Sequence, residues 1–300
     1  MIGDIERGDD WTLINGDSCE ELPAVADESV DLSVYSPPFA SLFTYSASEK
    51  DIGNCSGMDE FLIHLGFVIR EMFRVTKAGR NTCVHIAEVT STKATHGVIG
   101  LIDLPGMLVA AYQDAGWIYH GRITIDKDPQ AQAIRTHSKS LLFVQMKKDS
   151  TWSRPALADY ILIFRKPGDN AVPVTHDEGV ALAALSNEEW IEWARPIWYG
   201  IRESDTLNAA VARENDDERH ICPLQLGTIE RCVRLWSNPG DLVLSPFAGI
   251  GSEGYEAIRL GRRYLGIELK PSYFDVAVRN LQAAEQARTQ GRLFDAAVTA

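Results

Sequence analysis

The chain has 300 residues, the usual size of one α/β domain that carries an additional region. Its hydrophobic fraction of 45% and charged fraction of 24% are typical of a globular protein, and no apolar run approaches the roughly 20 residues of a membrane helix. The five cysteines form no Cys-x-x-Cys pair, which argues against a zinc site or a disulfide scaffold and predicts a cytoplasmic protein without a metal.

The net charge of −13 is distributed unevenly along the chain. Residues 120–166 contain nine Lys or Arg and four Asp, a local balance of +5, which leaves −18 for the remainder. A local basic region is what contact with nucleic-acid phosphates requires, whatever the total charge. Chance clustering on a solvated surface explains the same pattern about as well.

Predicted strands and helices alternate along the first half of the chain. The β-rich run Val30–Tyr35 ends at two prolines, and the Ser- and Gly-rich residues 40–57 are predicted to form a loop. Apolar residues at helical spacing predict a helix over 61–73, and Gly79 marks the end of that segment. Further along, the pattern predicts a strand at 82–87, a helix at 103–115, and strands at 117–125 and 159–165.

The second half begins with residues 169–215, the least regular part of the chain, which we interpret as an insertion within a single domain of residues 1–300. The pattern then predicts a helix at 223–236, a strand at 242–244, a glycine loop at 245–251, a helix at 252–260, a strand at 264–268 and a helix from Pro271. Strands that alternate with helices predict a parallel, doubly wound sheet. Ligands of such sheets bind beyond the carboxyl ends of the strands.

The glycine loop is the first motif that carries chemistry. Gly249 and Gly251 let the backbone approach a ligand where a Cβ would clash. Glu268 ends the next predicted strand, where a ribose-binding carboxylate is expected. Gly254 completes the spacing of a dinucleotide-binding loop, so this motif alone leaves a nicotinamide enzyme open.

The second motif is Ser36-Pro37-Pro38-Phe39, which directly follows a predicted strand. Its prolines make the backbone rigid and remove two N–H donors, so the segment offers a hydroxyl, carbonyl acceptors and an aromatic face. Such a site suits the exocyclic amine of a base, whose nitrogen lone pair is delocalised into the ring. Acceptors for both N–H groups would turn that lone pair toward an incoming methyl group. On its own, the motif is more simply a rigid turn.

The two motifs in this order resemble the β-ordered family of DNA amino-methyltransferases, in which the catalytic tetrapeptide precedes the cofactor loop. The resemblance extends over most of the chain, because residues 15–18, 77–79, 159–167 and 220–225 are similar to other segments of that family. It implies an α/β fold with a circularly permuted, Rossmann-like methyltransferase sheet and an inserted recognition region at 169–215. It also implies S-adenosylmethionine as the cofactor and double-stranded DNA as the partner, with no membrane association.

The resemblance assigns roles to particular residues. The catalytic segment is Ser36, Pro37, Pro38 and Phe39, with Phe39 stacking on a base that has left the duplex. The expected cofactor-binding residues are Asp17, His220, Cys222, Pro223, Leu224, Gln225, Ser245, Phe247, Ala248, Gly249, Gly251, Ser252 and Glu268. The family usually has Asp or Asn where this chain has Ser36, and Asp where it has Ser245. Ser36 keeps an uncharged acceptor, whereas Ser245 leaves open which group contacts the methionine amine.

Other enzyme classes explain the motifs less well. Protein-glutamine and RNA methyltransferases with a Pro-Pro-aromatic site carry their glycine loop first in the chain. A nicotinamide oxidoreductase gives residues 36–39 no role, and a non-catalytic DNA-binding module has no reason to keep both motifs. His64, His85, His96, His137 and His176 form no ligand cluster in the sequence, and we interpret them as surface or packing residues.

The DNA path and the assembly are predicted from composition. The expected phosphate contacts are Arg122, Lys127, Arg135, Lys139, Lys147 and Lys148. Adenine-N6 is slightly favoured over cytosine-N4 as the target, and both remain open. Apolar and aromatic residues at 180–201 could form the interface of a homodimer, and packing on the sheet explains them equally well.

Overall fold

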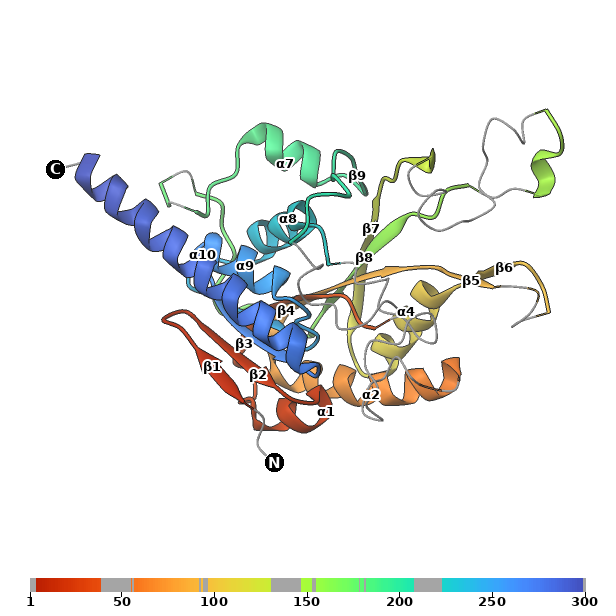
Figure 1. The fold of residues 1–300 in the computed structure, drawn as a ribbon, viewed down its shortest axis with the longest axis horizontal. Helices are drawn as coiled ribbons and strands as arrows, with labels where there is room; N and C mark the ends of the chain where they lie inside the picture. The colour runs from red at the N-terminus through yellow and green to blue at the C-terminus, as the bar shows by residue number, and fades with distance from the viewer. Residues whose placement is uncertain are drawn as a thin grey trace.

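The computed structural model describes residues 4–38, 55, 57–91, 93, 97–130, 147–152, 155–177, 179–180, 182–207 and 223–298. Within these residues, nine strands form one sheet in the order β1-β2-β11-β10-β3-β4-β8-β7-β9 (Figure 1). The strands are β1 (Ile5–Arg7), β2 (Trp11–Asn15), β3 (Val30–Tyr35), β4 (Thr76–Ala87), β7 (Ile118–Ile125), β8 (Asp159–Arg165), β9 (Ile197–Trp198), β10 (Leu242–Ser245) and β11 (Arg263–Glu268).

The sheet is parallel at its centre and antiparallel toward its edges. Strands β2, β11, β10, β3 and β4 are parallel neighbours. Strand β8 runs antiparallel to both β4 and β7, and β1 runs antiparallel to β2. The predicted parallel sheet is therefore present in the five central strands, but the prediction is wrong for β1 and β8, whereas β9 at one edge is parallel to β7. Strand β8 begins at Asp159, beside the last residues of β7 and β4, so the chain re-enters the sheet at the end where β7 leaves it and runs back antiparallel to both neighbours.

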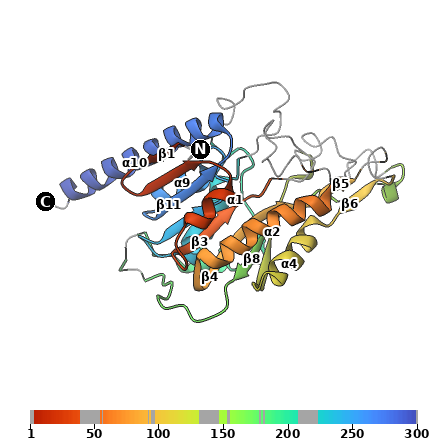
Figure 2. The same ribbon diagram turned by 90° about the horizontal axis from the view of Figure 1, so that it is seen from below.

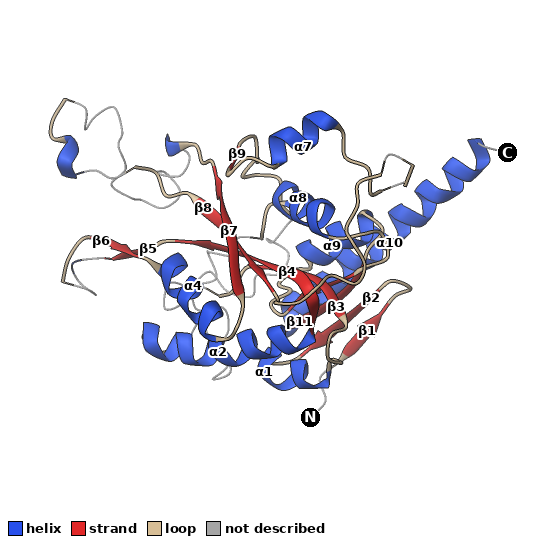
Figure 3. Ribbon diagram, turned by 180° about the vertical axis from the view of Figure 1, so that it is seen from behind, coloured by secondary structure: helices blue, strands red, loops and turns tan. Residues whose placement is uncertain are grey.

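Helices cover both faces of the sheet (Figures 1 and 2). They are α1 (Ser18–Glu21), α2 (Met58–Val75), α4 (Leu104–Asp114), α7 (Asn187–Trp193), α8 (Leu226–Trp236), α9 (Ser252–Arg259) and α10 (Pro271–Val298), with short 3-10 turns at Leu22–Ala24 and Ser150–Trp152. Helices α8, α9 and α10 build one hydrophobic core with the sheet, and α2 and α4 build the other. A separate hairpin of β5 (Val89–Ser91) and β6 (Gly100–Ile102) projects away from the main sheet (Figure 3).

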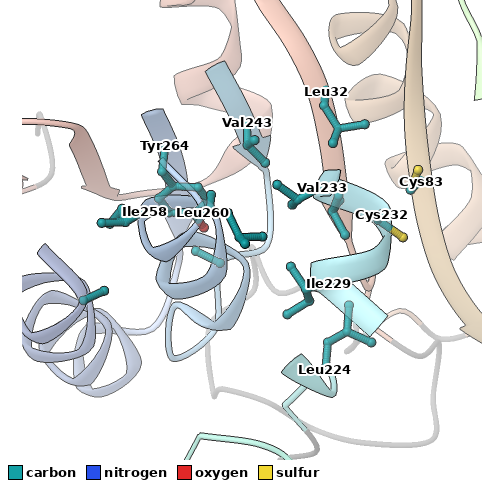
Figure 4. Close-up of a cluster of buried hydrophobic side chains, with 14 of the residues drawn as sticks. Leu32, Cys83, Leu224, Ile229, Cys232, Val233, Val243, Ile258, Leu260 and Tyr264 are labelled. Atoms are coloured by element: carbon teal, nitrogen blue, oxygen red, sulfur yellow. The ribbon is translucent and has the colours of Figure 1, made fainter. Parts of the chain in front are cut away.

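The apolar periodicity predicts the buried face of helix α2. Its buried residues are Phe61, Leu65, Val68, Ile69, Met72 and Val75. They recur at three- and four-residue intervals, which places them on one side of the helix. On the other face of the sheet, Val233 of α8 lies beside Leu32 and Val243, and Cys232 points toward Cys83 of β4 (Figure 4). The two helices thereby pack against opposite faces of the sheet at its centre.

Strands β3 and β10 are distant in sequence but adjacent in the sheet. They pair in parallel, with Val243 opposite Leu32 and Leu244 opposite Ser33. The chain leaves β3 toward α2 on one face and leaves β10 toward α9 on the opposite face. Divergence of this kind marks the switch point of an α/β sheet, beyond which ligands bind. The arrangement agrees with the permuted, Rossmann-like fold expected from the sequence.

Residues 169–207 are more regular than the sequence suggests. Ser186 caps helix α7 through a reciprocal pair of hydrogen bonds with Glu189. Strand β9 pairs with β7, and the buried indole of Trp198 donates to the carbonyl of Trp193 over 2.9 Å. Arg231 of α8 lies 2.9 Å from the carboxylate of Glu192. These contacts fasten the segment to the sheet edge and to α8.

Within the described residues, no helix combines the length and the apolar character needed to cross a membrane.

Candidate active site

The two sequence motifs meet at the switch point of the sheet. Ser36 follows the last residue of β3, and the glycine loop follows the last residue of β10. The ring of Tyr35, beside Ser36, lies 6.0 Å from the ring of Phe247 in the glycine loop, measured between centroids. Strand pairing therefore joins the proline motif and the glycine loop into one site.

The glycine loop has a backbone that favours glycine. Gly249 has φ +53° and Gly251 has φ +83°, a region that other residues adopt with strain. A Cβ on Gly249 would meet no atom of the described residues within 4 Å, so this stretch of backbone faces space that those residues leave open. A Cβ on Gly251 would lie 3.2 Å from the Cβ of Ala277 in α10. Gly249 thus leaves room for a ligand, whereas Gly251 allows close packing.

Glu268 is held at the end of β11 beside this loop. Its Oε2 accepts from the backbone N–H of Gly249 over 2.7 Å, and its Oε1 accepts from the N–H of Lys270 over 2.9 Å. A carboxylate at the end of the strand that follows a glycine loop is the type of group that accepts from ribose hydroxyls. The carboxylate and the loop therefore form a single unit.

The turn between β2 and α1 adjoins the same unit. The N–H of Gly16 donates to the carbonyl of Glu268 over 3.0 Å, and the hydroxyl of Ser18 donates to the carbonyl of Pro246. Asp17 caps helix α1, because its Oδ1 accepts from the N–H of Cys19 over 2.9 Å. The structure therefore brings Asp17, Glu268 and the glycine loop to one edge of the sheet.

Three predicted cofactor residues carry buried polar atoms that lack hydrogen-bond partners among the described residues. They are Ser245 Oγ at the end of β10, Ser252 Oγ in the first turn of α9 and Gln225 Oε1 at the N-cap of α8. Buried polar atoms are rarely left unpaired, so such atoms fit a polar ligand. Together with the space at Gly249, they make the site suitable for the cofactor implied by the motifs.

Other predicted cofactor residues are placed differently. The side chain of Leu224 is 4% exposed and belongs to the core beneath α8, so it serves packing. Ala248 is buried in the same core, and its N–H donates to the carbonyl of Ile267 over 2.9 Å. Pro223 is half-buried and Ser245 is buried at the end of β10. His220 and Cys222 lie outside the described residues.

The proline motif presents one hydroxyl beside two prolines. Pro37 is buried and Pro38 is half-buried, and Phe39 lies outside the described residues. The hydroxyl of Ser36 lies 3.3 Å from the carbonyl oxygen of His85 and 3.2 Å from Nδ1 of the same residue. Strand β4 supplies His85 because it is the parallel neighbour of β3.

A charged network continues from His85. Its Nε2 lies 3.2 Å from Oδ2 of Asp159, the first residue of β8, and Lys127 Nζ lies 2.7 Å from the same oxygen. Burial alone would raise the pKa of Asp159, but the adjacent His85 and Lys127 outweigh burial and hold that pKa well below its usual value. Asp159 therefore remains an anion inside the protein.

The expected DNA contacts are only partly at the surface. Arg122 is exposed and lies over the ring of Tyr160 at 5.1 Å, and Lys147 and Lys148 are exposed. The side chain of Lys127 is 4% exposed and paired with Asp159, so it is unsuited to contact phosphate. The expectation that Lys127 binds DNA is therefore wrong. Arg135, Lys139 and most of the loop at 40–57 lie outside the described residues.

Two residues of this region are not identified by sequence reasoning. His85 is interpreted from sequence as a packing residue, yet the fold places it against Ser36. Glu253, in the first turn of α9, is 4% exposed, and burial together with the charge of Glu268 raises its pKa to about 8. The only sequence signal for His85 is its position near the end of a predicted strand. This position indicates a functional role only when the order of the strands in the sheet is known.

Comparison with known proteins identifies the family. The model of the N6_N4_Mtase family, described as DNA methylase, matches residues 30–279. The type II methyltransferase M.Cfr9I of Citrobacter freundii is 27% identical over 302 residues, which cover 91% of this chain and 88% of that protein. The DNA adenine methyltransferase YhdJ of Escherichia coli K12 is 26% identical, with 91% and 83% covered. The type II methyltransferase M.BglI of Bacillus subtilis is 30% identical over 177 residues, and the match spans 59% of this chain but only 42% of M.BglI.

A solved structure agrees with the family match. TTHA0409 of Thermus thermophilus, solved in complex with S-adenosyl-L-methionine, superposes with a TM-score of 0.65 at 26% identity. The superposition covers 91% of this chain and 95% of that protein. The predicted family, fold class and cofactor are thereby confirmed. The chain belongs to the DNA methylase family of N6/N4 methyltransferases, which are S-adenosylmethionine-dependent enzymes.

Proposed function

We propose that the protein transfers a methyl group from S-adenosylmethionine to the exocyclic amine of a flipped base in double-stranded DNA, at a specific sequence. The observation that carries the proposal is the meeting of the Ser36-Pro37-Pro38 segment with the glycine loop, through the contact between Tyr35 and Phe247. Neither motif alone excludes a simple turn, but their juxtaposition supports the proposal that an acceptor-rich edge works beside a cofactor-binding loop.

The cofactor would be held by residues at the carboxyl ends of β2, β10 and β11. Glu268 suits the ribose hydroxyls, Asp17 suits the adenine, and Ser252 and Gln225 offer unpaired polar atoms. When bound, S-adenosylmethionine supplies an electrophilic methyl group on a sulfonium. The backbone around Gly249 leaves open space for its approach.

Ser36 would bind the target amine. The two prolines that follow it have no N–H, so this edge offers only acceptors to the two N–H groups of the base. Accepting these hydrogen bonds withdraws the nitrogen lone pair from the ring and directs it toward the methyl donor. The base must leave the duplex for this contact, because its amine is otherwise paired and stacked. The contribution of the site is positioning and preorganised dipoles.

The test of this assignment is Ser36→Ala. Because Ser36 acts on the reacting amine, kcat should fall by about 10²-fold while the affinity for S-adenosylmethionine is unchanged. Methyl transfer to DNA is measured with radiolabelled cofactor, and cofactor affinity is measured by calorimetry. Ser29→Ala is the matched control, since its hydroxyl bonds locally to the carbonyl of Ala26. Wild-type turnover in Ser36→Ala would show that the motif forms a turn without a catalytic role.

Adenine-N6 is slightly favoured as the target, with cytosine-N4 as the alternative. A neutral serine acceptor suits either amine, because both carry two N–H donors on an aromatic ring. The relative YhdJ, which is named a DNA adenine methyltransferase, aligns over 91% of this chain and supports the preference.

DNA would lie across the exposed part of the basic stretch, at Arg122, Lys147 and Lys148, with residues 169–215 contributing to sequence recognition. A homodimer in the cytoplasm completes the proposal. Of the apolar residues expected at its interface, Trp190, Ile191 and Ile197 are exposed by 48%, 61% and 38%. A monomer in light scattering at micromolar concentration would remove the dimer from the proposal.

A further inference from the structure

We infer that His85 is a positioning residue that directs the lone pairs of the Ser36 hydroxyl, rather than its proton, toward the target amine. The inference rests on the proposed function, because it concerns how Ser36 serves that same reaction. It follows from the contacts among the ends of four strands.

The hydroxyl of Ser36 has two hydrogen-bond partners among the described residues, and both belong to His85. One is the backbone carbonyl oxygen at 3.3 Å, which can only accept. The other is Nδ1 at 3.2 Å, which accepts or donates according to the ring tautomer. The tautomer of the imidazole therefore decides whether both lone pairs of the Ser36 hydroxyl remain available to the target amine.

Asp159 selects the tautomer. Its Oδ2 lies 3.2 Å from Nε2 of His85, an ion-pair distance without the alignment of a hydrogen bond, and the negative charge of a carboxylate this close favours the proton on Nε2. Nδ1 is then a bare acceptor. Lys127, at 2.7 Å from the same oxygen, keeps the carboxylate charged in a buried setting. His85 and Lys127 are buried, and electrostatic interactions are stronger in a buried setting, so the preference for a proton on Nε2 is strengthened.

With Nδ1 as an acceptor, the proton of Ser36 is directed to His85 whichever of the two partners it takes. Both hydroxyl lone pairs then remain for the N–H groups of the amine. With the opposite tautomer, Nδ1–H would donate to Ser36 and compete with the substrate for a lone pair. A network that merely joined β4 to β8 would account for Asp159 and Lys127, but would give no reason for the ring to face Ser36.

The arrangement has a consequence for pH. Protonation of His85 turns Nδ1 into a donor, so turnover should fall on the acid side of the pH profile. The charged groups that face His85 among the described residues are Asp159 at the start of β8 and Lys127 after β7. Strand β3 contributes only the neutral Ser36.

The tautomer can be measured without any enzymatic activity. In the full-length protein labelled with ¹⁵N-histidine, long-range proton–nitrogen spectra distinguish Nε2–H from Nδ1–H. The signals of His85 are those that disappear in His85→Asn. We expect the Nε2–H form at neutral pH and a loss of that preference in Asp159→Asn. An Nδ1–H form in the wild type would overturn the inference.

Kinetics then test the role. In His85→Asn, the amide oxygen can replace Nδ1 as an acceptor but cannot titrate, so kcat should stay within about threefold of wild type and lose its acid-side fall. In His85→Leu, kcat should fall by at least about tenfold with unchanged cofactor affinity. His120→Asn, at an exposed histidine of β7, is the matched control.

The outcomes separate this inference from the proposed function. An inactive wild type would count against the proposed function, while the spectra would still report the tautomer. An active wild type with normal turnover in a folded His85→Leu would overturn the positioning role alone. If His85→Leu fails to fold, the His85→Asn profile decides: an acid-side fall identical to that of the wild type contradicts the inference.

Discussion

Glu253 shows how one buried acid can shape the pH dependence of stability. It lies in the first turn of α9, behind the glycine loop, with 4% of its surface exposed. Burial raises its pKa from 4.5 to about 8, its own backbone N–H partly opposes the shift, and the charge of Glu268 adds to it. In the folded protein without cofactor, this carboxyl is therefore protonated at neutral pH.

The sign of the effect follows from linkage. Between the unfolded pKa of 4.5 and the folded pKa of about 8, the folded state holds a proton that the unfolded chain releases. The free energy of unfolding should thus decrease as pH rises through this window, by up to about 1.4 kcal/mol per pH unit. Glu253→Gln should remove this contribution. Urea unfolding at about pH 5.5 and about pH 7.5 measures it, with the exposed Glu6→Gln as the control. An unchanged pH dependence in Glu253→Gln would contradict the assignment.

Lys127 gives a second prediction at the scale of single residues. Its ammonium is buried against Asp159, and removing it leaves the buried carboxylate with His85 as its remaining partner and without the lysine's positive charge. Lys127→Met should therefore lower the free energy of unfolding by about 3 kcal/mol. The exposed Arg122→Met should change it by less than about 0.5 kcal/mol. Equal effects of the two substitutions in urea unfolding would show that Lys127 has no special role in stability.

The glycine loop is tested at the scale of an element. Gly249→Val should weaken binding of S-adenosylmethionine by at least about tenfold, because it strains a left-handed backbone and fills the open space beside it. Gly240→Val is a matched control: Gly240 also has a positive φ and free space, but it lies in the turn before β10, away from the site. Calorimetry on both folded variants gives the comparison. Equal cofactor affinity in the two would place the cofactor elsewhere.

Elements whose burial is periodic could be predicted from the sequence, whereas strand direction could not. The helix around Phe61 to Phe73, the strand Asp159–Arg165 and the unit of β10, glycine loop and α9 are all present. Hydrophobic periodicity records which side chains are buried, but β8 is buried in the same way whether it runs parallel or antiparallel. The short strands β1 and β2 carry too few periodic positions to be recognised before their partners are known.

One part of the candidate site could likewise be predicted from the sequence, and another part could not. Ser36 and the glycine loop could be predicted because each is a local motif with its own backbone chemistry. The contacts among His85, Asp159 and Lys127 could not, since these residues are separated in sequence and meet only through the strand order β4-β8-β7. The same order explains why Lys127, expected at the DNA surface from composition, is buried.

The DNA path is a property of the whole molecule, whose net charge of −13 opposes nucleic acid except where positive charge is concentrated. Neutralising Lys147 and Lys148 together should weaken binding equally on all DNA sequences. It should also reduce the slope of log affinity against log salt by about 0.9 for each lysine–phosphate interaction that the substitutions remove. Fluorescence anisotropy over a salt series measures this slope. The wild-type slope in the double variant would place the DNA path elsewhere, with residues 40–57 as the first alternative.

The central claim is that this fold methylates an exocyclic amine of DNA, and nucleoside mass spectrometry tests it most directly. Unmethylated DNA is incubated with the purified protein and S-adenosylmethionine, digested to nucleosides and compared with the product of Ser36→Ala. We predict that N6-methyladenine appears with the wild type and is nearly absent with the variant, and N4-methylcytosine in its place would revise the target base while keeping the reaction. The claim would be contradicted if the only methylated base were 5-methylcytosine, or if no methylated base formed with folded, cofactor-bound protein on DNA of all sequences.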